Sequence, residues 1–195
     1  MKKWILALLI FPILSLSLTG QATPPSQDLK KVIESMPYKH PWKVRPFFDS
    51  YELVSFSSAP FPFSTKGEPE AEMIIATVPE KIPSGTPMDK ILKDQAAKVQ
   101  KDLKIVEYQE KDHTPVNNVV SYVQKIADSD VGFLQYRSLG EKGDKDDVPV
   151  TVKQALFVKG DQLYNIVLMV LYPAHQDEMR ADQIELVKGL LKSKL

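Results

Sequence analysis

Three histidines, His40, His113 and His175, are the side chains best suited to acid–base or metal chemistry at neutral pH. None has a second histidine or an acid at the spacing of a zinc motif such as H-E-x-x-H. Nucleophilic hydrolysis needs a serine held by a histidine and an acid, and the sequence has no G-x-S-x-G elbow. The chain also has no cysteine, which excludes thiol chemistry and thiolate metal sites. We therefore expect no catalytic residues, no metal ligands, no cofactor and no enzymatic activity, and a site assembled from distant residues stays open as an alternative.

Two acidic groupings are further candidates for chemistry. Asp128 and Asp130 could act as a carboxylate pair, but the segment that they flank has the composition of a hairpin turn. The loop over residues 141–147 mixes acids and lysines and lacks the spacing of a calcium-binding loop. Both groupings are interpreted as solvated turns.

The residues best suited to bind another macromolecule are aromatic side chains in a proline-stiffened segment. Aromatic residues and arginine are enriched at the energetic centres of protein interfaces. The alternative is that these side chains pack an irregular arm onto the core, which is the default for large apolar groups. The candidate binding residues are Trp42, Arg45, Phe47, Phe48, Phe61 and Phe63.

Length and charge narrow the class of protein. The chain has 195 residues, of which 43% are hydrophobic and 26% charged, as expected for a single globular domain. It has 25 basic and 25 acidic residues, so there is no basic excess to hold a phosphate backbone. We do not expect nucleic acid as a partner.

The first 22 residues have the layout of a secretory signal peptide. Lys2 and Lys3 precede an apolar run over residues 4–14, and small residues follow at positions 20 and 22. The run is shorter than the ~20 apolar residues of a membrane-spanning helix and contains Pro12. We expect cleavage after Ala22, a periplasmic or secreted protein, and no stable membrane anchor in the mature chain. An uncleaved anchor is the alternative.

The spacing of hydrophobic residues predicts the helices and strands of the rest of the chain. Residues 23–50 form an N-terminal part with a short helix at 28–35, capped by Ser26, and the proline-rich aromatic arm. Residues 51–195 form one α+β domain. A helix at 87–102 begins with Thr86 as its cap, and a closing helix spans 174–193. Strands are predicted at 52–58, 72–78, 103–109, 117–127, 132–139, 149–158 and 162–172.

The last of these strands is apolar on both faces, which indicates a central position in the sheet. Short connections between the later strands favour antiparallel neighbours. The predicted fold is therefore α+β, with an antiparallel sheet of about six to seven strands covered by two main amphipathic helices.

This order of elements resembles the fold group shared by the PsbP photosystem subunit, the Mog proteins and the bacterial envelope protein DcrB. The resemblance lies in the strand and turn SFSSAPFPF at 55–63, the helix start TPMD at 86–89, the strand pair across KGDQLY at 159–164, and the C-terminal helix. It implies the PsbP/Mog-like sandwich. Members of the group are mostly non-enzymatic binding or assembly factors.

The sequence therefore leads to three hypotheses on function. The first is a non-enzymatic, exported accessory protein of the periplasm that binds another envelope or secreted protein. The second is a protein that binds a small apolar or lipid-like ligand between sheet and helix. The third is a hydrolase whose site is not visible in the sequence.

Overall fold

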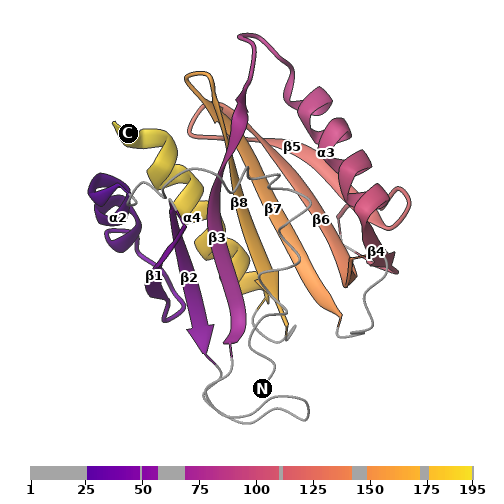
Figure 1. Ribbon diagram of the computed structural model, residues 1–195, viewed down its shortest axis with the longest axis horizontal. Coiled ribbons are helices and arrows are strands. Elements are labelled where there is room, and N and C mark those ends of the chain that lie inside the picture. The colour runs from indigo at the N-terminus through magenta and orange to yellow at the C-terminus, as the bar shows by residue number, and fades with distance from the viewer. Residues whose placement is uncertain are drawn as a thin grey trace.

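The structure is a computed structural model, and it describes residues 26–48, 50–56, 69–109, 112–141, 149–171 and 176–194. The expected signal peptide, His175, Phe61 and Phe63 lie outside the described residues. The described chain forms one twisted sheet with helices on both of its faces (Figure 1). The α+β class with an antiparallel sheet is therefore confirmed.

The sheet has eight strands in the order β1-β2-β3-β8-β7-β6-β4, and β5 also pairs with β6. All neighbours are antiparallel. The strands are β1 (Lys43–Phe47), β2 (Ser50–Phe56), β3 (Pro69–Lys81), β4 (Leu103–Val106), β5 (Val119–Ile126), β6 (Ser129–Glu141), β7 (Val150–Lys159) and β8 (Gln162–Val170).

The predicted count of six to seven strands is too low because β1 was not expected. Its sequence KVRPF contains Pro46, which cannot donate to a ladder, and we assigned this segment to the arm. β1 is an edge strand that pairs with β2 alone, with Pro46 opposite Tyr51. An edge position is where a sheet tolerates proline.

The described chain has three helices: α2 (Gln27–Glu34), α3 (Met88–Asp102) and α4 (Gln176–Lys192). The last two correspond to the two main helices predicted, and α2 corresponds to the short helix predicted at 28–35. Ser26 caps α2 as expected, since its hydroxyl accepts from the amide of Leu29 at 3.4 Å. The start of α3 differs by one residue from the prediction. Pro87 takes the capping position in an extended conformation, and the hydroxyl of Thr86 instead donates to the carbonyl of Pro83.

The two faces of the sheet carry separate cores. We call the face that is covered by α4 and α2 the α4 face. Its buried side chains include Leu53, Met73, Phe133, Phe157 and Leu168. β8 contributes buried residues to both faces, which confirms the prediction of a central strand buried on two sides.

We call the opposite face, against which α3 packs, the α3 face. It holds the second core, which includes Ile74, Leu134, Val152, Leu156 and Val167. α3 packs mainly against β4, β5 and β6, at one end of the sheet (Figure 1). Within the described chain, the α3 face of β2, β3 and β8 therefore has no helix in comparable contact.

The turn between β5 and β6 is the hairpin expected from the sequence. Ala127 and Asp128 both have positive φ angles, 47° and 64°, as in the two-residue turns that suit strand twist. Asp130 forms an ion pair with Lys125 at 2.9 Å on the neighbouring strand. The two aspartates thus lie at a turn and an exposed ion pair, and not in a carboxylate site.

Gly132 determines how closely α3 approaches the sheet. A Cβ atom at this position would lie 2.8 Å from Cγ of Leu92 and 2.9 Å from Sδ of Met88, closer than real contacts allow. Met88 and Leu92 are both buried in the core of the α3 face. The missing side chain at Gly132 is therefore what lets the first turns of α3 pack against β6.

We predict that Gly132→Ala lowers the free energy of unfolding by about 1–3 kcal/mol, because the added methyl group overpacks this contact. Chemical denaturation measures the change. In a Leu92→Ala background the same substitution should cost less, since the space is then open. An equal cost in both backgrounds would contradict the assignment of the strain to Leu92.

Candidate functional site

The aromatic arm is held by one buried carboxylate on α4. Asp182, which is 1% exposed, accepts hydrogen bonds from the backbone amides of Lys39 and His40 at 2.8 and 2.9 Å. It also accepts from the indole nitrogen of Trp42 at 2.9 Å. Three donors from one short segment satisfy this carboxylate, so Asp182 fixes the arm before it enters β1.

His40 lies in a small polar cluster with Ser55 of β2 and Glu70 of β3. Its Nε2 atom is 2.6 Å from the Ser55 hydroxyl and 3.2 Å from a carboxylate oxygen of Glu70. A hydrolytic triad places the serine and the acid on different nitrogens of the imidazole, whereas here both contact the same one. Ser55 is also fully buried. The cluster therefore has the partners of a hydrolase without the required geometry, and it serves to tie the arm to β2 and β3.

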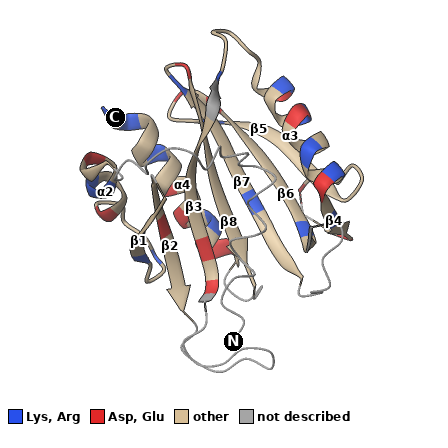
Figure 2. Cartoon of the chain, viewed as in Figure 1, with Lys and Arg blue, Asp and Glu red and all other residues tan. Residues whose placement is uncertain are grey.

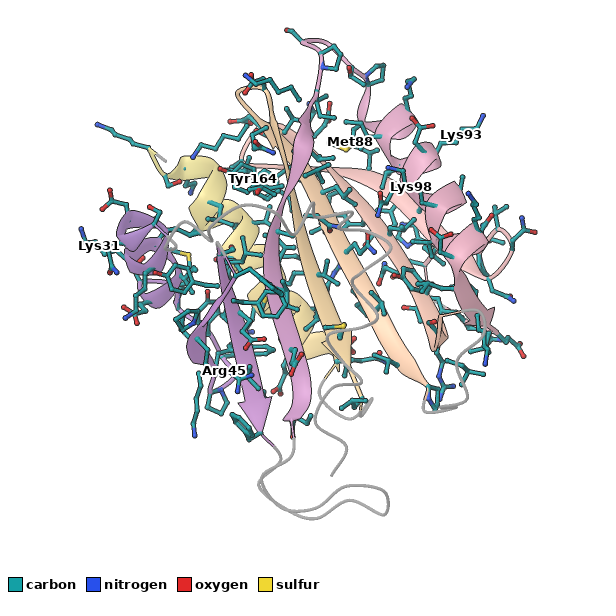
Figure 3. All side chains as sticks on the ribbon, viewed as in Figure 1. Lys31, Arg45, Met88, Lys93, Lys98 and Tyr164 are labelled. Carbon is teal, nitrogen blue, oxygen red and sulfur yellow. The ribbon has the colours of Figure 1, made fainter. Side chains whose placement is uncertain are left out.

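The predicted binding residues divide between internal contacts and the surface. Trp42 is partly buried against the core of the α4 face, and Phe47 packs against the core of the α3 face. Arg45, labelled in Figure 3, pairs with Glu52 of β2 at 2.9 Å. Phe48 is 49% exposed and follows β1 with a positive φ of 52°. Within the described part of this set, Phe48 is thus the most available to a partner.

His113 lies far from His40 in a network on the α4 face. Its ring stacks on Tyr122 with centroids 3.8 Å apart. The Tyr122 hydroxyl accepts from Arg180 of α4 at 2.8 Å and from Gln135 of β6 at 3.3 Å. The Arg180 guanidinium also lies over the ring of Phe133, 4.1 Å from its centroid. This network joins α4 to the sheet.

The described segments have neither a cluster of metal ligands nor a membrane-spanning helix. They contain no group of three or more His, Asp or Glu side chains that could hold a metal ion. No helix among them is long and apolar enough to cross a membrane.

The strand register brings an unexpected set of polar side chains together on the α3 face. Residues directly opposite each other in antiparallel strands point to the same face. One such row runs over β3, β8, β7 and β6 and consists of Ile74, Val167, Gln154 and Leu134. The next row over the same strands consists of Ala76, Asn165, Leu156 and Gly132. The row on the other side of Gln154 consists of Val54, Glu72, Met169, Val152 and Tyr136.

Two amides in these rows are fully buried and incompletely hydrogen-bonded. Asn165 has no partner for either its amide nitrogen or its amide oxygen, and Gln154 has none for its oxygen. The Gln154 nitrogen donates to the Tyr136 hydroxyl at 3.1 Å. Transfer of an amide from water to an apolar environment without a hydrogen bond costs on the order of 2–7 kcal/mol. Unpartnered buried amides are therefore rare in folded proteins and need an explanation.

These two amides account for most of the unsatisfied polar atoms in the described chain. Five buried side-chain atoms there have no partner, and three of them belong to Gln154 and Asn165; the other two are on Tyr38 and Gln95. Gln154 and Asn165 are diagonal neighbours on β7 and β8, with Cβ atoms about 7–8 Å apart. One molecule that offers both donors and acceptors can therefore satisfy both.

Two buried carboxylates, Glu52 of β2 and Glu72 of β3, lie on the same face of the sheet as the amides, each 8% exposed. Figure 2 colours the acidic residues of these two strands red. Burial, together with the nearby charge of Glu52, raises the pKa of Glu72 to about 7 against the opposing effect of Arg45. Burial also raises the pKa of Glu52, against the opposing effect of Arg45. We call Glu52, Glu72, Gln154 and Asn165 the polar set of the α3 face.

The polar set was not identified from the sequence, although one signal was present. Each residue interrupts an apolar strand, as Glu72 does before MII and Asn165 before IVLMV. A polar residue on a strand that is apolar on both sides must be buried, and a buried polar residue needs an explanation. The sequence did not reveal which of these interruptions meet, since this depends on register.

Among known proteins, the chain is similar to solved structures and to no protein-family model or curated sequence. No protein-family model matches the sequence, and no curated protein matches it significantly. The structure is similar to the crystal structure of a Pseudomonas aeruginosa protein of unknown function, described as a putative regulator. The TM-score is 0.47 and the sequence identity 10%, over 80% of this chain and 99% of the other.

We predict that Asp182→Ala releases the arm and lowers the free energy of unfolding by about 2–4 kcal/mol, because three donors lose a charged acceptor. Denaturation gives the loss, and a red shift of indole emission reports exposure of Trp42. Asp177→Ala, at an exposed position of the same helix, is the control and should leave both readouts near those of the wild type. Similar effects of the two substitutions would contradict the role of Asp182 as an anchor.

A second prediction concerns the pH dependence of stability. Because the pKa of Glu72 is raised in the folded state, folding binds a proton, and stability falls as pH rises from about 4.5 to above 7. Glu72→Gln cannot ionise and should be more stable than the wild type at pH 8, by at most about 3 kcal/mol. The difference should disappear near pH 4. Urea denaturation at several pH values measures it, and parallel pH profiles would contradict the raised pKa.

Proposed function

We propose that this protein is a non-enzymatic, exported accessory protein that binds a peptide segment of another envelope or secreted protein on the α3 face. The observation that carries the proposal is the pair of fully buried amides, Asn165 and Gln154, whose polar atoms lack partners. A peptide group offers one donor and one acceptor, which is what such amides pair with. The neighbouring apolar residues suit the apolar side chains of a bound segment.

The position of α3 on the sheet supports this proposal. Helix α3 packs mainly over β4 to β6, whereas the polar set lies on β2, β3, β8 and β7. Both amides are fully buried, so a segment that lies across these strands reaches them only once the cover over this face is displaced. The exposed Phe48, at the end of β1, offers a further contact at the rim.

The sequence features support the same proposal. The leader has the layout of an export signal, and the resemblance to the PsbP, Mog and DcrB fold group is with proteins that mostly bind or assemble others. The hydrolase hypothesis has less support, because both partners of His40 contact the same imidazole nitrogen.

A small apolar or lipid-like ligand is the second candidate function, and the apolar residues of the α3 face favour it. Val167 and Met169 of β8 and Ile74 of β3 would line such a site. Such a ligand would leave the atoms of Asn165 and Gln154 unpartnered, at the cost that buried amides carry. The amides therefore favour a peptide over a hydrocarbon chain.

We predict that Asn165→Leu leaves the free energy of unfolding unchanged or raises it, because a nearly isosteric apolar group replaces an unsatisfied amide. Gln183→Met is the matched control. Gln183 is also fully buried, but its nitrogen donates to the carbonyls of Lys153 and Ile166, so its loss should cost about 1–3 kcal/mol. Denaturation curves compare the two variants. A comparable loss in both would contradict the unpartnered state of Asn165.

Binding is tested with a positional-scanning library of acetylated and amidated hexapeptides and, separately, with a fluorescent fatty acid. Peptides selected by the wild type should bind Asn165→Leu at least about tenfold more weakly, the effect of losing one well-made hydrogen bond. Gln183→Met, on the opposite face, should retain their affinity. Selection of no peptide, or equal binding by Asn165→Leu, would overturn the proposal. Fatty acid binding that improves in Asn165→Leu would favour the second candidate.

A further inference from the structure

The turn between β1 and β2 holds a bulky side chain in a backbone conformation that such residues disfavour. β1 ends at Phe47 and β2 begins at Ser50, its partner in register, so two residues connect the strands. Phe48, the first of them, has a positive φ of 52°. A side chain with a Cβ atom meets a steric cost in this left-handed region, which Gly, Asn and Asp tolerate best. Because the ring of Phe48 is 49% exposed, packing offsets little of this cost.

Other turns of the described chain meet the same requirement with short side chains. The remaining non-glycine residues with positive φ in these segments are Asn117, Asn118, Ala127 and Asp128. The turn between β7 and β8 uses Gly160, with a φ of 65°. The residues around Phe48 instead suit an extended chain, because Pro46 has a fixed φ and aromatic residues favour strands. The β1–β2 turn therefore carries a local strain that straightening of the chain would relieve.

The part of the chain before this turn is held by contacts that a second copy of the protein also offers. We call residues 26–47, which contain α2 and β1, the N-terminal unit; α2 lies beside α4, and β1 beside β2 (Figure 1). Asp182 accepts three hydrogen bonds from this unit. Met36 occupies the space left by Gly189 of α4, since a Cβ atom there would overlap with its Sδ atom. Each of these contacts can form equally well with the α4 and β2 of another molecule.

From the strained turn and these contacts we infer that two copies of the protein exchange their N-terminal units. In this dimer β1 continues into β2 as one extended strand, Phe48 has a β conformation, and each β1 pairs with the partner's β2. The contacts of the monomer are kept, and the strain is relieved at two turns, as short strained connections favour. The inference is independent of the proposed peptide binding, because the exchanged contacts lie on the α4 face and at the β1 edge.

The dimer fraction is measured by native mass spectrometry after the protein has been refolded from urea at high concentration. The wild type should give a dimer that persists on dilution, because the bonds to Asp182 must break before the units can return. Phe48→Gly removes the strain from the turn and should lower the dimerisation constant at least about tenfold, since the effect counts at two turns. Phe48→Val keeps a β-branched side chain at the strained position and should dimerise at least as well as the wild type.

The matched control for the Phe48 variants is Val116→Gly. Val116 is the other exposed large hydrophobic residue of the described chain, at 70%, and it lies next to a different turn. Its replacement removes exposed apolar surface and leaves the β1–β2 turn intact. The dimer fraction of this variant should equal that of the wild type.

Charge reversal distinguishes exchange from side-by-side association. Arg45 of β1 lies opposite Glu52 of β2 and pairs with it at 2.9 Å. Arg45→Glu and Glu52→Arg each place like charges opposite one another, which destabilises the strand pair. In an exchanged heterodimer of the two variants both pairs again have opposite charges, whereas side-by-side association restores neither. The two variants refolded together should therefore give at least about tenfold more heterodimer than either homodimer.

A wild type that stays monomeric after refolding at high concentration would overturn the inference. Equal dimerisation of Phe48→Gly and the wild type would do the same. Loss of the dimer in both Phe48→Gly and Phe48→Val would assign it to contact through the exposed ring, which also contradicts exchange. A charge-reversed mixture without excess heterodimer counts against exchange when both variants fold. If they do not fold, the Phe48 series, which keeps the ion pair, decides the matter.

Discussion

A sheet that is buried on both faces leaves its polar side chains no route to water, so each of them needs a partner inside the protein. On the α4 face Asp182 accepts three donors and Gln183 donates to two carbonyls, and the Tyr38 hydroxyl, which packs against that core, is left without a partner. On the α3 face Asn165 and Gln154 together retain three unsatisfied atoms. This larger deficit is the physical basis for proposing a binding surface on the α3 face, because stability alone would favour apolar residues at these positions.

The arm shows how an irregular, proline-rich segment becomes part of the core. Its anchor joins residues that are about 140 positions apart, with 140 separating Trp42 from Asp182. The hydrogen-bonded carboxylate, the His40 cluster and the pairing of β1 with β2 act on consecutive parts of the same segment. Large aromatic groups in such a segment are buried for structural reasons, which is why residue type alone overestimates how many of them could contact a partner.

The sequence was sufficient for the elements whose period is long and regular. α3, α4, the two-sided burial of β8 and the β5–β6 turn follow from patterns within a few residues of each other. β1 was missed because five residues with a proline carry too little periodic signal. The polar set was missed for another reason. Glu72 and Gln154 are separated by 82 positions and share a face only through the pairing of β3, β8 and β7. Local pattern contains no information on that register.

Pro46 and the divided pairing of β6 have a consequence for the behaviour of the protein at high concentration. One border of the sheet ends in β1, where a proline offers no N–H group to an incoming strand. The opposite border is shared by β4, which has four residues, and β5, so no single strand follows β6 along its length. The β1 border is thus a poor template for fibril growth, because Pro46 interrupts the row of donors that an added strand would need, whereas the eight residues of β5 contain no such break.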